Sequence, residues 1–136
     1  MTAVADTGFI LAVAVRADAK HAACLSIYRS QSVIYLPQST LAEVAYLLTR
    51  AGGNEATAHF LDGLPRTKYR LVALEDDDVA RVAQLLKQYA MARIDFVDMT
   101  VVAIAERLEI RRILTVDQRD FRMVRPTHCP YLEILP

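Results

Sequence analysis

Short apolar runs that alternate with helix-length amphipathic segments constrain the fold of this chain more than any other feature. Segments such as LAEVAYLLTR, DVARVAQLLKQYA and DMTVVAIAERLEI carry apolar residues at helical spacings of three and four. Strands that alternate with helices predict right-handed crossovers and a sheet covered on both faces. We therefore predict an α/β fold, a three-layer α/β/α sandwich with a mostly parallel central sheet of four to five strands. The strand-like runs are AVA at 3–5, VIYL at 33–36, YRLVAL at 69–74, RILTV at 112–116 and the closing YLEIL.

The length of the chain, 136 residues with 54% hydrophobic side chains, fits one compact domain. No repeat, low-complexity tract or linker divides it, so we predict a single domain over residues 1–136. Within GGNEATAHFLDGLPR, Gly52 and Gly53 indicate a break and Pro65 a stop. This pattern predicts a short additional helix between them.

The composition excludes several classes of protein. The 16 basic and 16 acidic side chains cancel, so any binding of nucleic acid depends on a local patch. Cys24 and Cys129 lie far apart and form no Cys/His cluster, which argues against a zinc site or a disulfide framework. FILAVAV lacks the basic region that precedes a signal peptide core and is too short to span a membrane. We expect a soluble, cytoplasmic protein with no membrane partner.

Four acidic residues fall where a ligand site of such a fold lies. Asp6 directly follows the first predicted strand, and Asp117 directly follows the fourth. Glu43 lies in the first turn of the helix after the second strand, and Asp98 opens the helix DMTVVAIAERLEI. Ligands bind at the carboxyl ends of strands in an open parallel sheet, where helix first turns also converge. The four acids are therefore expected to meet at one edge of the sheet, provided that the first and fourth strands are neighbours.

Each acid alone also has a structural explanation. Thr40 and Glu43 match a capping box, and Asp6, Asp98 and Asp117 are acceptable N-caps. Four acids in matching positions favour a site instead. Carboxylates about 6 Å apart repel by about 3 kcal/mol per pair at an effective dielectric of about 20, so such a cluster needs a cation. Oxygen ligands without nearby His or Cys indicate one or two Mg²⁺ or Mn²⁺ ions and predict metal-assisted phosphodiester hydrolysis.

The motifs VADTGFILA, LAEV, FVDMTVVAIAERLEI and RILTVDQRDF, in this order, resemble those of the PIN-domain nucleases, and in particular the VapC-type toxins of bacterial toxin–antitoxin pairs. The resemblance runs from residue 3 to the closing YLEIL. It implies a parallel-sheet α/β/α fold with an acidic pocket that binds Mg²⁺ or Mn²⁺ and cuts RNA. By motif position it assigns metal binding and water activation to Asp6, Glu43, Asp98 and Asp117, and it gives Thr115 a supporting role through hydrogen bonds.

The resemblance also implies two protein partners, a cognate antitoxin and a second copy of the chain in a homodimer. Asp95, three residues before Asp98, is an alternative for the third acid if the helix begins earlier. Asp120 follows Asp117 at the same interval, and we assign it to the outer shell or to solvent. The family often has glycine at the position of Glu109.

Two other functions compete with a metal-dependent ribonuclease. The first is a catalytically silent PIN-like module that binds RNA or protein, which the intact set of acids disfavours. The second is a phospho-receiver domain, which needs an acidic pair after the first strand, an Asp ending the third and a Lys ending the fifth. The chain has Asp6-Thr7, Leu74-Glu75 and Ile134-Leu135 at these places, so this function is also disfavoured.

Five arginines make the C-terminal part of the chain locally basic. They either provide phosphate contacts beside Asp117 or form a solvated face balanced by Asp117 and Asp120. The sequence favours neither interpretation. The residues are Arg111, Arg112, Arg119, Arg122 and Arg125.

Overall fold

A computed structural model describes all 136 residues of the chain. Five strands and six α-helices alternate along it, with one 3-10 turn, η1 (Leu64–Arg66), after the third helix. The strands are β1 (Thr2–Ala5), β2 (Val33–Pro37), β3 (Tyr69–Val72), β4 (Arg112–Leu114) and β5 (Glu133–Leu135). The helices are α1 (Thr7–Ala14), α2 (His21–Ser30), α3 (Gln38–Gly63), α4 (Asp76–Gln88), α5 (Phe96–Leu108) and α6 (Gln118–Met123).

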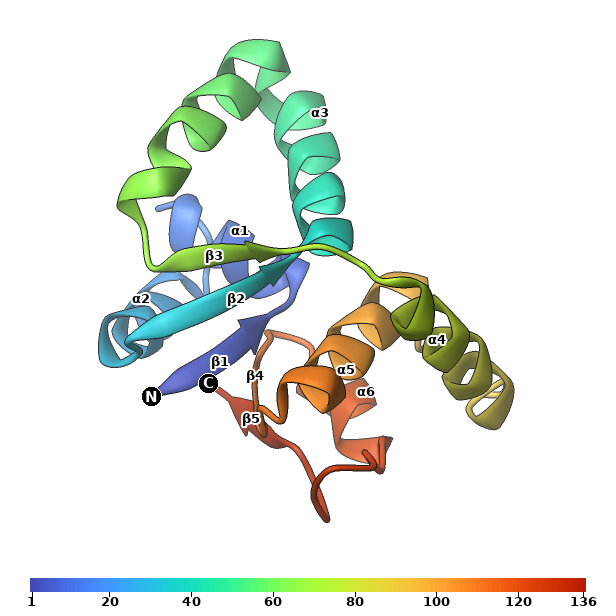
Figure 1. Cartoon of the computed structure of the whole chain (residues 1–136). Coiled ribbons are helices and arrows are strands. Elements are labelled where there is room, and N and C mark those ends of the chain that lie inside the picture. The colour runs from blue at the N-terminus through green and yellow to red at the C-terminus, as the bar shows by residue number, and fades with distance from the viewer.

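The five strands form one parallel sheet in the order β3-β2-β1-β4-β5. From β1 the chain runs outward through β2 to β3, then crosses to the other side of β1 to form β4 and β5 (Figure 1). The strand order therefore reverses at β1, and this is where ligands bind in folds of this kind. The predicted parallel sheet is confirmed. So is the required neighbourhood of the first and fourth strands, because β1 pairs directly with β4.

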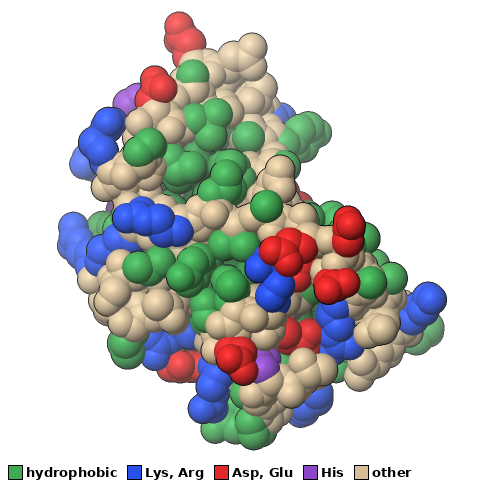
Figure 2. Space-filling model, in the orientation of Figure 1, with side chains coloured by type: hydrophobic (Ala, Val, Ile, Leu, Met, Phe, Trp, Pro, Cys, Tyr) green, Lys and Arg blue, Asp and Glu red, His purple; other side chains and the backbone are tan.

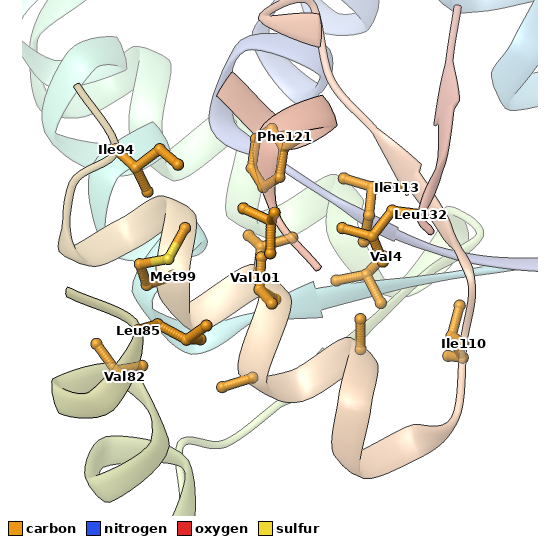
Figure 3. Close-up of a cluster of buried hydrophobic side chains, with 14 residues drawn as sticks. Val4, Val82, Leu85, Ile94, Met99, Val101, Ile110, Ile113, Phe121 and Leu132 are labelled. Carbon is orange, nitrogen blue, oxygen red and sulfur yellow. The ribbon is translucent and has the colours of Figure 1, made fainter. Parts of the chain in front are cut away.

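Helices cover both faces of the sheet, as predicted for a three-layer sandwich. Successive side chains of β1 point to opposite faces. Ala3 and Ala5 pack into a cluster with α1, α2 and α3, whereas Val4 packs into a second cluster with α4, α5 and α6. Figure 3 shows the second cluster, in which Met99 and Val101 of α5 lie among side chains from the neighbouring helices and strands. Residues 99–105 of α5 are all buried, so this helix fixes the second layer onto the sheet.

α3 is bent at Gly53, which confirms the break predicted from the glycine pair. Gly53 has φ 75° and ψ −176°, a backbone conformation that is accessible almost only to glycine. The two halves of α3 form an arch above β3 (Figure 1). The Thr57 hydroxyl joins them, since it lies 2.6 Å from the Thr49 hydroxyl and donates to the Ala45 carbonyl at 3.2 Å. These hydrogen bonds thus hold the two halves of α3 together.

The C-cap of α5 is Glu109, a position at which the family often has glycine. Glu109 adopts the left-handed conformation (φ 56°, ψ 42°), and its N–H bonds the carbonyl of Glu106 at 3.2 Å. This is the helix-ending geometry that glycine usually supplies. The turn into β4 therefore forms with glutamate in place of glycine.

The acidic run Glu75–Asp78 begins α4, with Glu75 as the N-cap. Asp78 accepts a hydrogen bond from the Glu75 N–H at 2.9 Å, and it is almost fully buried. Arg107 of α5 donates to the same carboxylate at 3.0 Å. This ion pair joins α4 to α5, so the acidic run has a structural role in the fold.

Charged side chains of both signs are interspersed on the surface seen in Figure 2, which agrees with the net charge of zero. None of the helices combines the length and apolar character needed to cross a membrane. Two helices, α1 and α6, lie outside the helical segments predicted from the sequence. They begin directly after Asp6 and Asp117, so both acids lie where a strand gives way to a helix.

Candidate functional site

Asp6 lies at the carboxyl end of β1 and is 7% exposed. It occupies the N-cap position of α1, but its side chain makes no capping hydrogen bond. Instead its Oδ2 accepts a hydrogen bond from the Thr115 hydroxyl at 3.3 Å. The carboxylate is therefore directed toward β4 and is not used to begin the helix.

Thr115 connects the ends of β1 and β4. Its hydroxyl is fully buried, donates to Asp6 and accepts a hydrogen bond from the Asp117 N–H at 3.0 Å. This bridge follows from the sheet register, in which Ala5 pairs with Leu114 and the Asp6 N–H donates to the Leu114 carbonyl at 2.9 Å. A single hydroxyl thus fixes the position of Asp6 relative to the segment that carries Asp117.

Glu43 makes no capping box with Thr40. α3 begins at Gln38, three residues earlier than that pattern requires, and its N-cap is Pro37, whose side chain has no hydrogen-bond acceptor. Glu43 consequently lies beyond the first turn of α3 and is partly exposed. Its negative charge acts on Asp6 and raises the pKa of that carboxyl group, so the two acids share one electrostatic environment.

Asp95 and Asp98 cap α5 together. The Asp98 N–H donates to Asp95 Oδ1 at 2.9 Å, and the Asp95 N–H donates to Asp98 Oδ2 at 3.2 Å. Asp95 is the N-cap, because α5 begins at Phe96, two residues before the position expected from the sequence. Asp98 is therefore not the N-cap expected from the sequence but the third helical residue of a capping box whose N-cap is Asp95. One carboxylate oxygen of each residue nevertheless remains outside the capping bonds.

The pKa values of Asp6 and Asp98 reflect a crowded set of acids. Burial raises the pKa of Asp6 to about 6, with further increases from the charges of Glu43 and Asp95 and decreases from hydrogen bonds with Thr7 and Thr115. Burial and the Asp6 charge raise the pKa of Asp98 to about 8, and the Asp95 charge adds to the increase. The structure thus brings together Asp6, Glu43 and Asp98, with Asp95 as an additional member. We call these four residues the acid cluster.

Asp117 belongs to an adjoining acidic pair. It is exposed, sits at the N-cap position of α6 without a capping side-chain bond, and lies next to Asp120. Burial and the Asp117 charge raise the pKa of Asp120, while Arg119 and Arg93 lower it. Asp120, which we assigned to the outer shell or to solvent, is half-buried beside Asp117. The backbone N–H of Asp117 is thus linked to Asp6 through Thr115, whereas the Asp117 side chain faces Asp120.

The residues of this edge fit a hydrated divalent cation. No three acidic, histidine or cysteine side chains lie close enough together to enclose a metal ion. Mg²⁺ does not require such a cage, because it keeps several water ligands and takes one or two protein carboxylates. Burial is the main cause of the raised pKa values of Asp6 and Asp98, and the charges of neighbouring acids add to it, so ionisation of these groups is unfavourable without a cation. Two buried hydroxyls also lack a hydrogen-bond partner, that of Thr7, directly after Asp6, and that of Thr40, three residues before Glu43.

Gly8 allows α1 to pack closely against the segment between Thr115 and Asp117. A Cβ atom at Gly8 would lie 2.5 Å from Cγ2 of Val116. We predict that Gly8→Ala displaces Val116 and lowers the free energy of unfolding by about 1–3 kcal/mol, the usual cost of overpacking. Gly63→Ala is the matched control, since a Cβ there meets no atom within 4 Å. Equal urea midpoints for the two variants would show that Val116 adapts without cost.

Comparison with known proteins gives consistent matches over nearly the whole chain. The family model described as the PIN domain matches residues 3–125. Ribonuclease VapC26 of Mycobacterium tuberculosis is 28% identical over 134 residues, which cover 98% of this chain and 99% of that protein.

Solved structures share the fold at low sequence identity. The sarcin-ricin loop cleaving toxin VapC20 of Mycobacterium tuberculosis superposes with a TM-score of 0.80 at 22% identity, covering 94% of this chain and 98% of that one. VapBC2 from Rickettsia felis, bound to a DNA fragment from its promoter, gives a TM-score of 0.72 at 15% identity, covering 98% and 97% of the two chains.

Proposed function

Because the chain belongs to the PIN-domain family, we propose that it is a metal-dependent ribonuclease that hydrolyses RNA phosphodiester bonds as the toxin of a toxin–antitoxin pair. The observation that carries the proposal is the position of Asp6 at the carboxyl end of β1, where the strand order reverses, with Glu43 and Asp98 close enough for charge interactions with it. The names of the relatives support it, since one is a ribonuclease and another a toxin that cleaves the sarcin-ricin loop. We assign the activity to one domain over residues 1–136, because β5 lies beyond the matched residues yet pairs with β4.

We assign metal binding to Asp6, Glu43, Asp98 and Asp117. When bound, Mg²⁺ or Mn²⁺ supplies Lewis acidity, which lowers the pKa of water and offsets the charge that develops on the phosphate. The first three acids are held on separate elements, at the end of β1, within α3 and at the start of α5. Their arrangement is therefore set by the packed fold before any ligand binds. This preorganisation reduces the reorganisation needed for reaction.

Thr115 acts as a positioning residue in this scheme. Its hydroxyl holds one Asp6 oxygen through the 3.3 Å hydrogen bond and leaves the other free of that bond. The same hydroxyl fixes the backbone at Asp117. The low exposure of Asp6 limits its contact with water, and charge interactions are stronger in such an environment.

We propose a cognate antitoxin and a second copy of the chain as protein partners. A toxin–antitoxin complex from Klebsiella pneumoniae shares the fold with a TM-score of 0.67, which supports a partner of this class. Several large apolar side chains are exposed and available for such contacts, among them Tyr46 at 64%, Leu71 at 57% and Phe96 at 47%. An RNA substrate is consistent with action in the cytoplasm.

The test of this function is cleavage of defined RNAs by the purified chain. We expect cleavage of at least one messenger, transfer or ribosomal RNA in the presence of Mg²⁺ or Mn²⁺, because the acid cluster needs a cation to bind phosphate. EDTA should stop the reaction, and excess Mg²⁺ should restore it. An Asp6→Asn preparation, purified in parallel, controls for contaminating ribonuclease. Binding of RNA without cleavage of any of these substrates would contradict the proposal and favour a silent binding module.

A further inference from the structure

A hollow of about 530 Å³ is lined by Asp117 and Asp120. One wall is formed by residues 91–93 of the loop between α4 and α5, and the other by residues of α6 and its N-cap, including Asp117, Arg119 and Asp120. Asp117, which lines the hollow, is linked to the acid cluster by hydrogen bonds, since its N–H donates to Thr115 and Thr115 donates to Asp6. On the opposite wall Arg93 precedes Asp95, a member of the acid cluster, by two residues.

Most of the predicted basic patch is committed to other contacts. Arg112 pairs with Glu133 at 3.1 Å. Arg122 donates to the Gln118 side chain at 2.9 Å, and Arg125 donates to backbone carbonyls. Of the five arginines noted in the sequence, only Arg119 lines the hollow. Of the two interpretations of these arginines, phosphate contacts beside Asp117 therefore remain open for Arg119.

Arg93 joins Arg119 from the other wall. Both side chains are exposed. Neither guanidinium forms a hydrogen bond or a salt bridge with another residue of the chain. Their donors are therefore available to a ligand. Met91, which is fully exposed, and Met123, at 43%, add apolar surface to the same hollow. The hollow thus offers two guanidinium groups with unused donors and flexible apolar side chains, beside the acidic side chains of Asp117 and Asp120.

This combination suits a single strand of RNA. A guanidinium binds phosphate through paired hydrogen bonds, and the thioether side chains can contact base faces without selecting a sequence. The net charge of the chain is zero and the acid cluster repels phosphates, so the attraction for RNA has to be local. We propose that Arg93 and Arg119 bind the phosphates of the RNA strand next to the bond that is cut. This inference rests on the proposed ribonuclease function and names the residues that hold its substrate.

The test compares two double variants that remove the same charge. Arg93→Gln with Arg119→Gln empties the hollow of cations. Arg29→Gln with Arg111→Gln is the matched control, because both residues are exposed and lie at the opposite edge of the sheet, near the start of β3 and directly before β4. Each pair is introduced into the Asp6→Asn protein, and binding of a single-stranded RNA oligonucleotide is measured by fluorescence anisotropy with Mg²⁺ over a range of salt concentrations.

We expect the Arg93/Arg119 pair to raise the Kd at least about tenfold, as loss of charged hydrogen bonds does. The slope of log affinity against log salt should fall by about 1.4, which corresponds to about 0.7 per phosphate contact on a single strand. The control pair should leave both quantities unchanged. An equal loss in the two pairs, or no loss in either, would overturn the inference. Absence of cleavage by the wild-type chain would instead refute the ribonuclease function, since the binding comparison does not depend on cleavage.

Discussion

Asp6→Asn, Glu43→Gln, Asp98→Asn and Asp117→Asn are each expected to lower Mg²⁺-dependent RNA cleavage by at least about a hundredfold, since loss of outer contacts of a metal site alone costs about 10- to 100-fold. Each substitution keeps the size of the side chain and removes its negative charge. Single-turnover cleavage of a defined RNA, measured for the four variants beside the wild-type chain, provides the comparison. Asp62→Asn, an exposed position on the second half of α3, is the matched control and should cleave like the wild type.

The same variants should unfold at equal or higher temperature than the wild-type chain. Asp6 and Asp117 make no capping hydrogen bonds that an amide could disturb, and Asn is as good an N-cap as Asp. The Asp98 side chain accepts a hydrogen bond from the Asp95 N–H, and an amide oxygen can do the same. Retained stability with lost cleavage would separate a role in metal binding from a role in capping.

Two outcomes would revise the assignment of ligands. Cleavage by the Asp98→Asn variant would show that Asp98 is not the third acid, and Asp95→Asn would then be tested, since Asp95 belongs to the same cluster. Cleavage by Asp117→Asn together with its loss in Asp120→Asn would exchange the roles of these neighbours. Their shared environment makes this comparison necessary.

The sequence was sufficient to predict the sheet and the positions of Asp6 and Asp117 after two neighbouring strands. Both follow from patterns that are local in the chain, namely the alternation of strands and helices and the acids directly after two strands. The capping interactions were harder to predict, because they depend on the residue at which a helix starts. α3 begins at Gln38, three residues before the start that the capping box requires, and α5 begins at Phe96, two residues before the expected start. These shifts leave Glu43 free of a capping box and make Asp95 the partner of Asp98.

The residues of the hollow illustrate a second limit of local patterns. Arg93 lies in a loop with no neighbouring basic residue in the sequence, so it belongs to no run of charge that would predict a binding role. The fold brings it opposite Arg119, whereas Arg112 is paired with Glu133 of β5. Whether an arginine is free or paired depends on contacts between segments that are distant in sequence. Composition and charge runs contain no information about such contacts.

The metal-free protein is expected to lose stability as the pH rises, to the extent that Asp6 and Asp98 control it. In the folded chain their pKa values are about 6 and about 8, above the ordinary value of 3.8. The folded state therefore binds more protons than the unfolded state between these limits, and the free energy of unfolding falls as these groups ionise. Asp98→Asn removes the largest part of this dependence. Its stability relative to the wild type should increase from about pH 5 to about pH 8 in chelated buffer.

Mg²⁺ is expected to reverse this loss of stability. A cation that binds only the folded chain raises its melting temperature, and it competes with protons for the same carboxylates. Millimolar Mg²⁺ should therefore raise the melting temperature of the wild type more at about pH 8 than at about pH 5. It should have little effect on Asp98→Asn, while Asp62→Asn should respond like the wild type. Equal shifts in all three proteins at both pH values would mean that Mg²⁺ binds elsewhere. Thermal scans with and without the metal thus test the cation requirement of the acid cluster independently of any RNA substrate.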